Sequence, residues 1–326
     1  MIEAGAFSRR RRRRSPFPAV RRLVVGGSCV ALVGLGACGD FTPYNRLDKL
    51  RVLAVAGEPA NPGPGETANL SALVYTPPGG IPVAYEWSWC PFPGLPNDGY
   101  PCLVTEEEVS ALTGTPMTFD LGTAERAALP HTVPPDALRA LCEGTPGVPR
   151  FRDCEGGFPI QIRLRVSSGV ESVTAIHTVR LRFDPSTEIN ANPRVDGLIA
   201  VLPDGDRPIT EDAALVTLPR NRETTLRALV PDGASEAFTT TDDMGRPTVT
   251  RERLFLTWFV ESGTTDDTRT GFIEGSVPFE QALTNSWKPA KTEDYPAETA
   301  RLIVVVRDSR GGSSWRSGIV TLEDSP

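Results

Sequence analysis

Apolar and polar residues alternate along several short segments of the chain. The clearest alternation, in residues 83–89, places Val83, Tyr85, Trp87 and Trp89 at every second position. A period of two puts these side chains on one face of a β-strand, which predicts a sheet with one buried face. The same pattern predicts strands at 50–56, 67–75, 160–167 and 173–183.

This set of strands is then repeated along the chain. The second set of predicted strands is 223–230, 254–260, 301–308 and 317–322. Segment 223–230 aligns with 67–74, and Trp258 takes the place of Trp87. An internal repeat of this kind predicts two domains of one type. The predicted domains are 49–184 and 194–326, with a linker at 185–193.

Each predicted domain carries a Trp on its third strand, where the side chain would pack between two antiparallel sheets. This arrangement resembles the immunoglobulin-like (Ig-like) sandwich. The disulfide that joins strands B and F in antibody domains is missing, so fibronectin-like and cadherin-like variants stay open. The 30 Gly and 31 Pro among 326 residues suit many short strands and turns rather than a helical bundle. We therefore expect an all-β protein of two tandem Ig-like antiparallel β-sandwiches.

The first predicted domain carries an insertion at 91–158 that interrupts the strand pattern. Thr105 followed by Glu108 is a capping-box sequence, which predicts a short helix that ends before Gly114. A second short helix is predicted from Pro134–Asp136 to Cys142, closed by Gly144. We expect this insertion to cover an edge of the first sandwich or to form a binding surface.

Four cysteines lie in or beside the insertion: Cys90, Cys102, Cys142 and Cys154. An even number in an exported protein predicts two disulfides. Three pairings are possible, and the equal spacing of the cysteines favours Cys90 with Cys102 and Cys142 with Cys154. A zinc site is the alternative, which the absence of any C-x-x-C sequence and the presence of only two histidines disfavour.

Residues 1–37 have the features of an export signal. Eight Arg precede or flank the start of an apolar run at 23–37, which is too short to span a bilayer as a mature helix. The run ends in Leu35, Gly36, Ala37 and Cys38, which resembles the lipobox of bacterial lipoprotein signal peptides. The resemblance implies cleavage before Cys38 and attachment of the chain to a lipid bilayer through acylated Cys38. An uncleaved signal anchor or an ordinary secretory signal is the alternative.

The lipobox resemblance also implies a location and a family. Gly39 follows Cys38 where Asp would retain the protein in the inner membrane, which favours the outer membrane of the cell envelope. Residues 38–48 would be a lipidated tether, and Arg21–Arg22 leave general and twin-arginine export open. Together with the repeat and the sequence Tyr85–Pro91, the chain resembles tandem Ig-like lipoproteins of myxobacteria. This resemblance implies no particular activity for the chain.

The charge and the motifs of the chain argue against nucleic-acid binding and against several common classes of enzyme. The net charge is −7, but without the Arg-rich residues 1–37 it falls to about −14, and no dense basic cluster remains to bind nucleic acid. No G-x-S-x-G, H-E-x-x-H or phosphate-loop sequence occurs. His177 shares a strand face with apolar residues and His131 lies between loop prolines. We therefore expect a non-enzymatic protein without a cofactor.

Several residues are candidates for binding a partner. The loop 308–315 offers Arg310 and Trp315 to an envelope protein or glycan. Calcium at the acidic turns Asp204–Asp206 and Asp242–Asp243 is a weaker alternative to their simple solvation. The alternative function is a surface carbohydrate-binding or hydrolytic module. It requires four aromatic residues to line a groove: Trp89, Phe92, Trp287 and Trp315.

Overall fold

The computed structural model describes residues 43–79, 81–143, 154–184, 186–242 and 244–324. Residues Thr42–Pro326 form one compact unit. The predicted signal segment 1–37 and the lipidation site Cys38 lie outside the described residues. Within the described residues, no helix is both long and apolar enough to span a bilayer.

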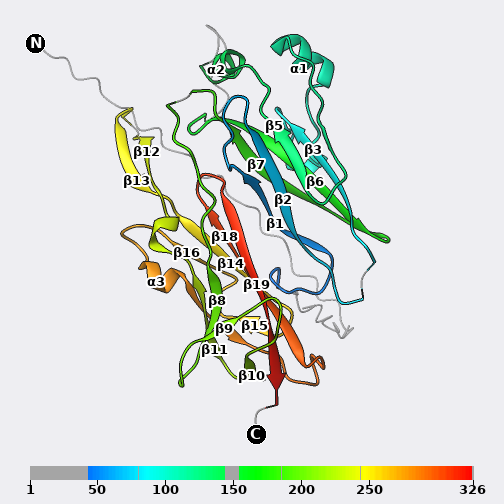
Figure 1. The fold of residues 1–326 in the computed structure, drawn as a ribbon, viewed down its shortest axis with the longest axis vertical. Helices are drawn as coiled ribbons and strands as arrows, with labels where there is room; N and C mark the ends of the chain where they lie inside the picture. The colour runs from blue at the N-terminus through cyan, green and yellow to red at the C-terminus, as the bar shows by residue number, and fades with distance from the viewer. Residues whose placement is uncertain (1–42, 80, 144–153, 185, 243, 325–326) are drawn as a thin grey trace, which may run out of the picture. The chain divides into compact units, whose positions relative to one another are not determined.

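The first sandwich pairs a three-stranded sheet with a four-stranded sheet (Figure 1). The three-stranded sheet has the order β1 (Arg51–Glu58), β2 (Thr67–Tyr75), β5 (Ala127–Pro130). The four-stranded sheet has the order β4 (Asp120–Gly122), β3 (Ala84–Cys90), β6 (Phe158–Ser168), β7 (Glu171–Leu181). All these pairs are antiparallel. Trp87 is 1% exposed between the sheets, and its Nε1 donates to the carbonyl of Ala124 at 2.9 Å.

The second sandwich pairs two five-stranded sheets. One sheet has the order β10 (Thr217–Pro219), β19 (Ser313–Glu323), β18 (Thr299–Asp308), β14 (Leu254–Val260), β16 (Arg269–Phe272). The other has the order β15 (Thr264–Thr265), β17 (Thr284–Lys288), β11 (Thr224–Leu229), β8 (Gly197–Val201), β9 (Arg207–Ile209). The short helix α3 (Phe279–Ala282) precedes β17. Trp258 and Trp287 are buried in this core. The prediction of two Ig-like sandwiches, each built around a strand-borne Trp, is confirmed.

One pair of strands departs from the antiparallel expectation. β10 runs parallel to β19, with Leu218 opposite Leu322. Leu218 is fully buried and Leu322 nearly so, and both belong to the second core. β10 is only three residues long, and it adds to the edge of a sheet whose other pairs are all antiparallel.

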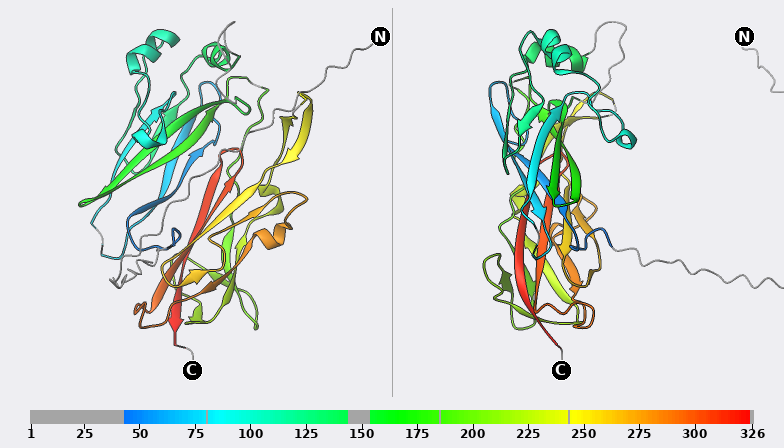
Figure 2. Two further views of the ribbon diagram at one scale, coloured as in Figure 1. Left: turned by 180° about the vertical axis from the view of Figure 1, so that it is seen from behind. Right: turned by 90° about the vertical axis from the view of Figure 1, so that its right-hand side faces the viewer.

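The insertion forms both predicted helices at one end of the first sandwich (Figure 2). Helix α1 (Glu106–Thr113) has the full capping box. The Thr105 hydroxyl accepts from the Glu108 backbone N–H, the Glu108 carboxylate accepts from the Thr105 N–H, and Gly114 closes the helix with φ 69°. Helix α2 (Pro135–Glu143) buries Leu138 in the first core. Disulfides join Cys90 to Cys102 and Cys142 to Cys154, the pairing that the equal spacing favours.

The two sandwiches share a third apolar cluster. It joins β1 and β2 of the first sandwich to β14 and β18 of the second through seven buried residues: Leu47, Leu53, Ala54, Tyr75, Phe259, Ile303 and Val305. The chain entering the first sandwich also binds the second. The Leu47 N–H donates to the Val260 carbonyl at 2.9 Å, and the Val260 N–H donates to the Asn45 carbonyl at 3.1 Å.

The segment predicted as a linker is hydrogen-bonded to both sandwiches. The Asn192 amide donates to the Gly57 carbonyl at 2.9 Å and accepts from the Ser313 N–H at 2.9 Å. The Asn190 N–H donates to the Asn61 side chain at 2.8 Å. These hydrogen bonds fix the segment to backbone or side-chain groups of both sandwiches, so it does not act as a flexible spacer.

A two-stranded ribbon stands outside both sandwiches. It consists of β12 (Ala237–Thr241) and β13 (Pro247–Arg251), paired antiparallel with Thr240 opposite Thr248. Figure 1 shows the ribbon projecting from the second sandwich. Its residues are exposed or half-buried on both faces. A strand pair with no buried face needs no alternation of apolar and polar residues, and the sequence pattern therefore does not predict these strands.

Candidate functional site

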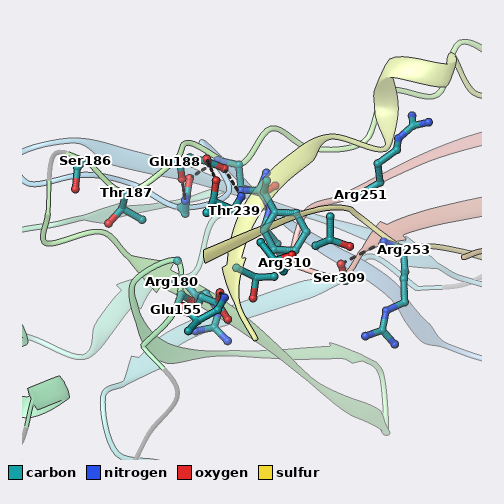
Figure 3. A pocket seen from close by; sticks show the side chains of 18 residues that line it. Glu155, Arg180, Ser186, Thr187, Glu188, Thr239, Arg251, Arg253, Ser309 and Arg310 are labelled. Carbon is teal, nitrogen blue, oxygen red and sulfur yellow. Dashed lines mark hydrogen bonds between the residues drawn. The ribbon is translucent and has the colours of Figure 1, made fainter. Parts of the chain in front are cut away.

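A cleft of about 730 Å³ lies between the ribbon and the first sandwich (Figure 3). The β12–β13 ribbon forms one wall, residues 186–190 form another, and the end of β7 with the turn after Cys154 forms a third. Ser309 and Arg310, at the tip of the β18–β19 hairpin, complete the lining. Its size is within the range of small-molecule binding sites in proteins.

Hydroxyl side chains dominate the lining of the cleft. Eight of its 18 residues carry a hydroxyl: Ser186, Thr187, Thr239, Thr240, Thr241, Thr248, Thr250 and Ser309. Among the described residues of the lining, Phe238 is the one aromatic residue and none carries an aliphatic side chain. Each hydroxyl can both donate and accept a hydrogen bond, so the cleft is suited to a polar ligand.

Two carboxylates hold the ribbon against the rest of the protein. Glu188 accepts from the Thr239 N–H at 3.3 Å and from the Thr239 hydroxyl at 3.1 Å. Glu155 accepts from the Thr241 N–H at 3.2 Å. These N–H groups lie on the edge of β12 that does not face β13, so the carboxylates occupy backbone donors that would otherwise be open to another strand.

Arg310 lies at the back of the cleft in an ion-pair network. Its Nε donates to Glu252 Oε1 at 2.5 Å and its Nη2 to Glu236 Oε2 at 2.7 Å. The guanidinium carbon lies 4.9 Å from the centre of the Phe238 ring. The side chain is only 13% exposed, and its positive charge is paired with carboxylates of the same chain.

Two acidic residues beneath Arg310 have unusual protonation equilibria. Glu252 is fully buried, and burial with the nearby Asp308 carboxylate raises its pKa from 4.5 to about 7, although Arg310 opposes the shift. Burial also raises the pKa of Asp308, while hydrogen bonds from backbone N–H groups of 310–312 oppose it. The Asp308 Oδ1 accepts from the Arg310 and Gly312 N–H groups at 2.8 Å each, which fixes the hairpin turn.

Arg253 differs from the other arginines of the cleft. Its side chain is exposed, while its backbone N–H donates to the Ser309 hydroxyl at 3.3 Å. In the part of the chain that the structure describes, no carboxylate lies within 4 Å of its guanidinium. By contrast, the Arg251 guanidinium donates to the Asp232 and Ser235 carbonyls. The Arg180 guanidinium donates to the Glu155 carbonyl at 2.8 Å. Arg253 therefore offers an exposed guanidinium to a ligand.

The residues singled out from the sequence lie apart. Arg310 is in the network described above, and Trp315 is half-buried on β19 against the cluster that the sandwiches share. The groove of aromatics that the alternative function requires is not formed, because Trp89 lies in the first core and Trp287 in the second. Phe92 packs against the first core. The binding roles of Arg310 and Trp315 stay predictions.

The acidic turns bind arginines of the same chain. Asp204 and Asp206 form ion pairs with Arg207 and Arg227. Asp242 pairs with Arg246, and Asp243 lies outside the described residues. Considering only the described ranges, no three His, Cys, Asp or Glu side chains form a cluster that could hold a metal ion.

Both histidines have structural contacts. Burial lowers the pKa of His131, whose Nε2 lies 2.8 Å from the Arg182 carbonyl and therefore carries the proton. His177 is half-buried on β7, on the face that the strand pattern predicts, opposite Ile162. Burial and the positive charge of Arg307 lower its pKa to about 4. Neither imidazole lines the cleft.

The chain was compared with protein families, curated proteins and solved structures. No protein-family model and no curated protein matches the chain. Solved structures match at a distance. The chain is 10% identical to red sea bream transglutaminase, covering 86% of this chain and 32% of that one with a TM-score of 0.24. It is 11% identical to the eight N-terminal Ig domains of Down syndrome cell adhesion molecule, covering 85% and 25% with a TM-score of 0.20.

A third match is to cadherin domains 3–6 of protocadherin gamma B2, at 14% identity, covering 83% of this chain and 53% of that one with a TM-score of 0.18. The chain thus spans about a third or less of the first two proteins and about half of the third. Similarities this remote carry no argument about function.

Proposed function

We propose that this chain is a lipid-anchored, non-enzymatic protein of the bacterial cell envelope that displays two Ig-like sandwiches as one binding or structural module. The observation that carries the proposal is the sequence Leu35-Gly36-Ala37-Cys38 at the end of an apolar run behind an Arg-rich segment. Gly39 after Cys38 supports the outer membrane as its location.

The position of an early contact in the described chain supports a display role. Asn45 is hydrogen-bonded to the second sandwich, because its amide donates to the Trp258 carbonyl at 2.8 Å. Asn45 lies seven positions after Cys38, and a chain of that length spans about 25 Å at most. An anchor at Cys38 would hold the module close to the bilayer surface.

The chemistry of the described residues supports a non-enzymatic role. The two histidines, which are the side chains most suited to proton transfer near neutral pH, are buried or half-buried with lowered pKa values. Glu252, whose raised pKa would suit a general acid, has no exposed surface through which a substrate could reach it.

Acylation of Cys38 is tested by metabolic labelling in a bacterial host. The unaltered chain is expected to incorporate palmitate and to remain in the membrane fraction, whereas Cys38→Ala loses both. Cys29→Ala is the matched control, because Cys29 lies within the apolar run and precedes the predicted cleavage site. Labelling that persists in Cys38→Ala, or that is lost equally in Cys29→Ala, would overturn the anchor.

A further inference from the structure

We infer that the cleft beside the β12–β13 ribbon binds an anionic saccharide, a short sugar chain that carries a carboxylate or phosphate group. The inference deepens the proposed display function by assigning a site and a ligand class to it. It is independent of how the chain is anchored, since it depends only on described residues between Asn61 and Arg310.

One face of the ribbon carries three of the hydroxyls that line the cleft. Phe238 lies opposite Thr250, and Thr240 lies opposite Thr248, so these four side chains share one face of the ribbon. All four line the cleft. Three hydroxyls side by side on a strand pair offer a row of donors and acceptors, which matches the repeated hydroxyls of a sugar chain.

Residues of different chemistry lie toward opposite sides of the cleft. Figure 3 shows Ser186 and Thr187 at one end and Arg253 at the other, with the ribbon between them. A ligand that extends along the ribbon would therefore meet Ser186, Thr187 and the Glu188 carboxylate toward one end and the exposed guanidinium of Arg253 at the other. Because a guanidinium forms its strongest hydrogen bonds with carboxylate or phosphate, the Arg253 end selects an anion.

A peptide strand is a poorer fit to the same wall. A strand adds to a sheet edge through free backbone N–H groups. On the cleft side of β12, the N–H groups of Thr239 and Thr241 already donate to Glu188 and Glu155. The Thr239 hydroxyl is also held by Glu188. The hydroxyls of Thr240, Thr248 and Thr250 remain available, which favours a sugar over a peptide.

Binding is tested by titration calorimetry on the full chain, purified in detergent. The probes are trigalacturonate, its neutral counterpart maltotriose, and an acidic peptide, Asp-Asp-Asp. Trigalacturonate is expected to bind with a dissociation constant that rises with salt, and at least tenfold more tightly than either other probe. Failure of trigalacturonate to bind, or equal binding of maltotriose or of the peptide, would overturn the inference.

Two variants locate the site. Arg253→Gln should weaken trigalacturonate binding about tenfold, because it removes a charged hydrogen-bond donor. The matched control is Arg222→Gln, since Arg222 is also exposed but lies outside the cleft. Thr248→Val with Thr250→Val should weaken binding while leaving its salt dependence unchanged, and Thr174→Val on β7 should leave binding as it is. An equal loss in Arg222→Gln would indicate general charge attraction and refute the site.

The outcome separates this inference from the anchor proposal. If palmitate labelling at Cys38 is found but trigalacturonate does not bind, the display function stands and the ligand class is wrong. If trigalacturonate binds with the expected variant effects but Cys38 is not acylated, the cleft is retained and the anchor fails. Unfolding midpoints of all variants, measured alongside, show whether a loss of binding reflects a loss of fold.

Discussion

The buried carboxyl group of Glu252 should make the free energy of unfolding depend on pH. Its side chain has no exposed surface, and its two oxygens accept from Arg310 Nε and from the Glu236 N–H. Burial and the Asp308 carboxylate raise the pKa from 4.5 to about 7. The folded protein therefore holds the Glu252 proton more tightly than the unfolded chain does.

The sign of the effect follows from this difference in proton affinity. As the pH rises from 4.5 through 7, the unfolded chain ionises first and gains stability relative to the folded state. At about 1.4 kcal/mol per pH unit, the folded state loses about 2–3 kcal/mol between pH 5 and pH 8 through Glu252 alone. The Glu252→Gln variant cannot ionise at this position and does not lose this amount.

Urea unfolding at pH 5, 6, 7 and 8 measures the effect as a difference between variant and wild type. Any fixed cost of placing an amide beside Arg310 is the same at both ends of the pH range and cancels. We expect the stability of Glu252→Gln relative to wild type to rise by about 2–3 kcal/mol from pH 5 to pH 8. A relative stability that stays constant over this range would refute the reasoning.

A second variant provides a control of opposite sign. His177 has its pKa lowered from 6.5 to about 4, so the stability it contributes is present above pH 6.5 and is lost as the pH falls toward 4. His177→Gln should therefore gain stability relative to wild type on acidification, whereas Glu252→Gln gains it at alkaline pH. Because wild type contains both groups, their effects partly offset each other, and only the variants separate them.

Two further substitutions test other parts of the structure. Replacing both Cys90 and Cys102 by Ala removes a disulfide with a sequence separation of 12, which should lower the free energy of unfolding by about 3 kcal/mol in urea titrations without dithiothreitol and have no effect once the wild type is reduced. In Gly312→Ala the new Cβ would lie 2.0 Å from Asp308 Oδ2, whose carboxylate is fixed by backbone N–H groups. We expect a loss of about 1–3 kcal/mol by thermal and urea unfolding, and an unchanged midpoint would contradict the described turn.

The sandwiches could be predicted from the sequence because their strands bury one face. Trp87 and Trp258 recur in equivalent strands, and both are almost fully buried. The ribbon could not be predicted in this way, since neither of its faces is buried and its threonines carry no periodic signal. The weak signal that was present is the run Thr239-Thr240-Thr241, which is rich in a residue that favours strands.

The cleft could not be predicted because its residues come from distant parts of the chain. Asn61 lies in the first sandwich and Arg310 at the tip of the last hairpin, and only the tertiary fold brings them to one lining. Arg310 looked available from its glycine-rich loop, but Glu236 and Glu252 bind it. A buried glutamate is rare, so composition and pattern gave no reason to expect Glu252 in this position.

The contact of residues 45–47 with β14 has a mechanical consequence. Asn45 and Leu47 exchange two backbone hydrogen bonds with Val260, and only then does the chain enter β1. A pulling force applied to the N-terminal end is therefore borne first by the second sandwich, through a strand in the interior of its sheet. The second sandwich therefore carries this load before residues 185–193 are stretched, because the contact with Val260 comes before the first sandwich along the chain.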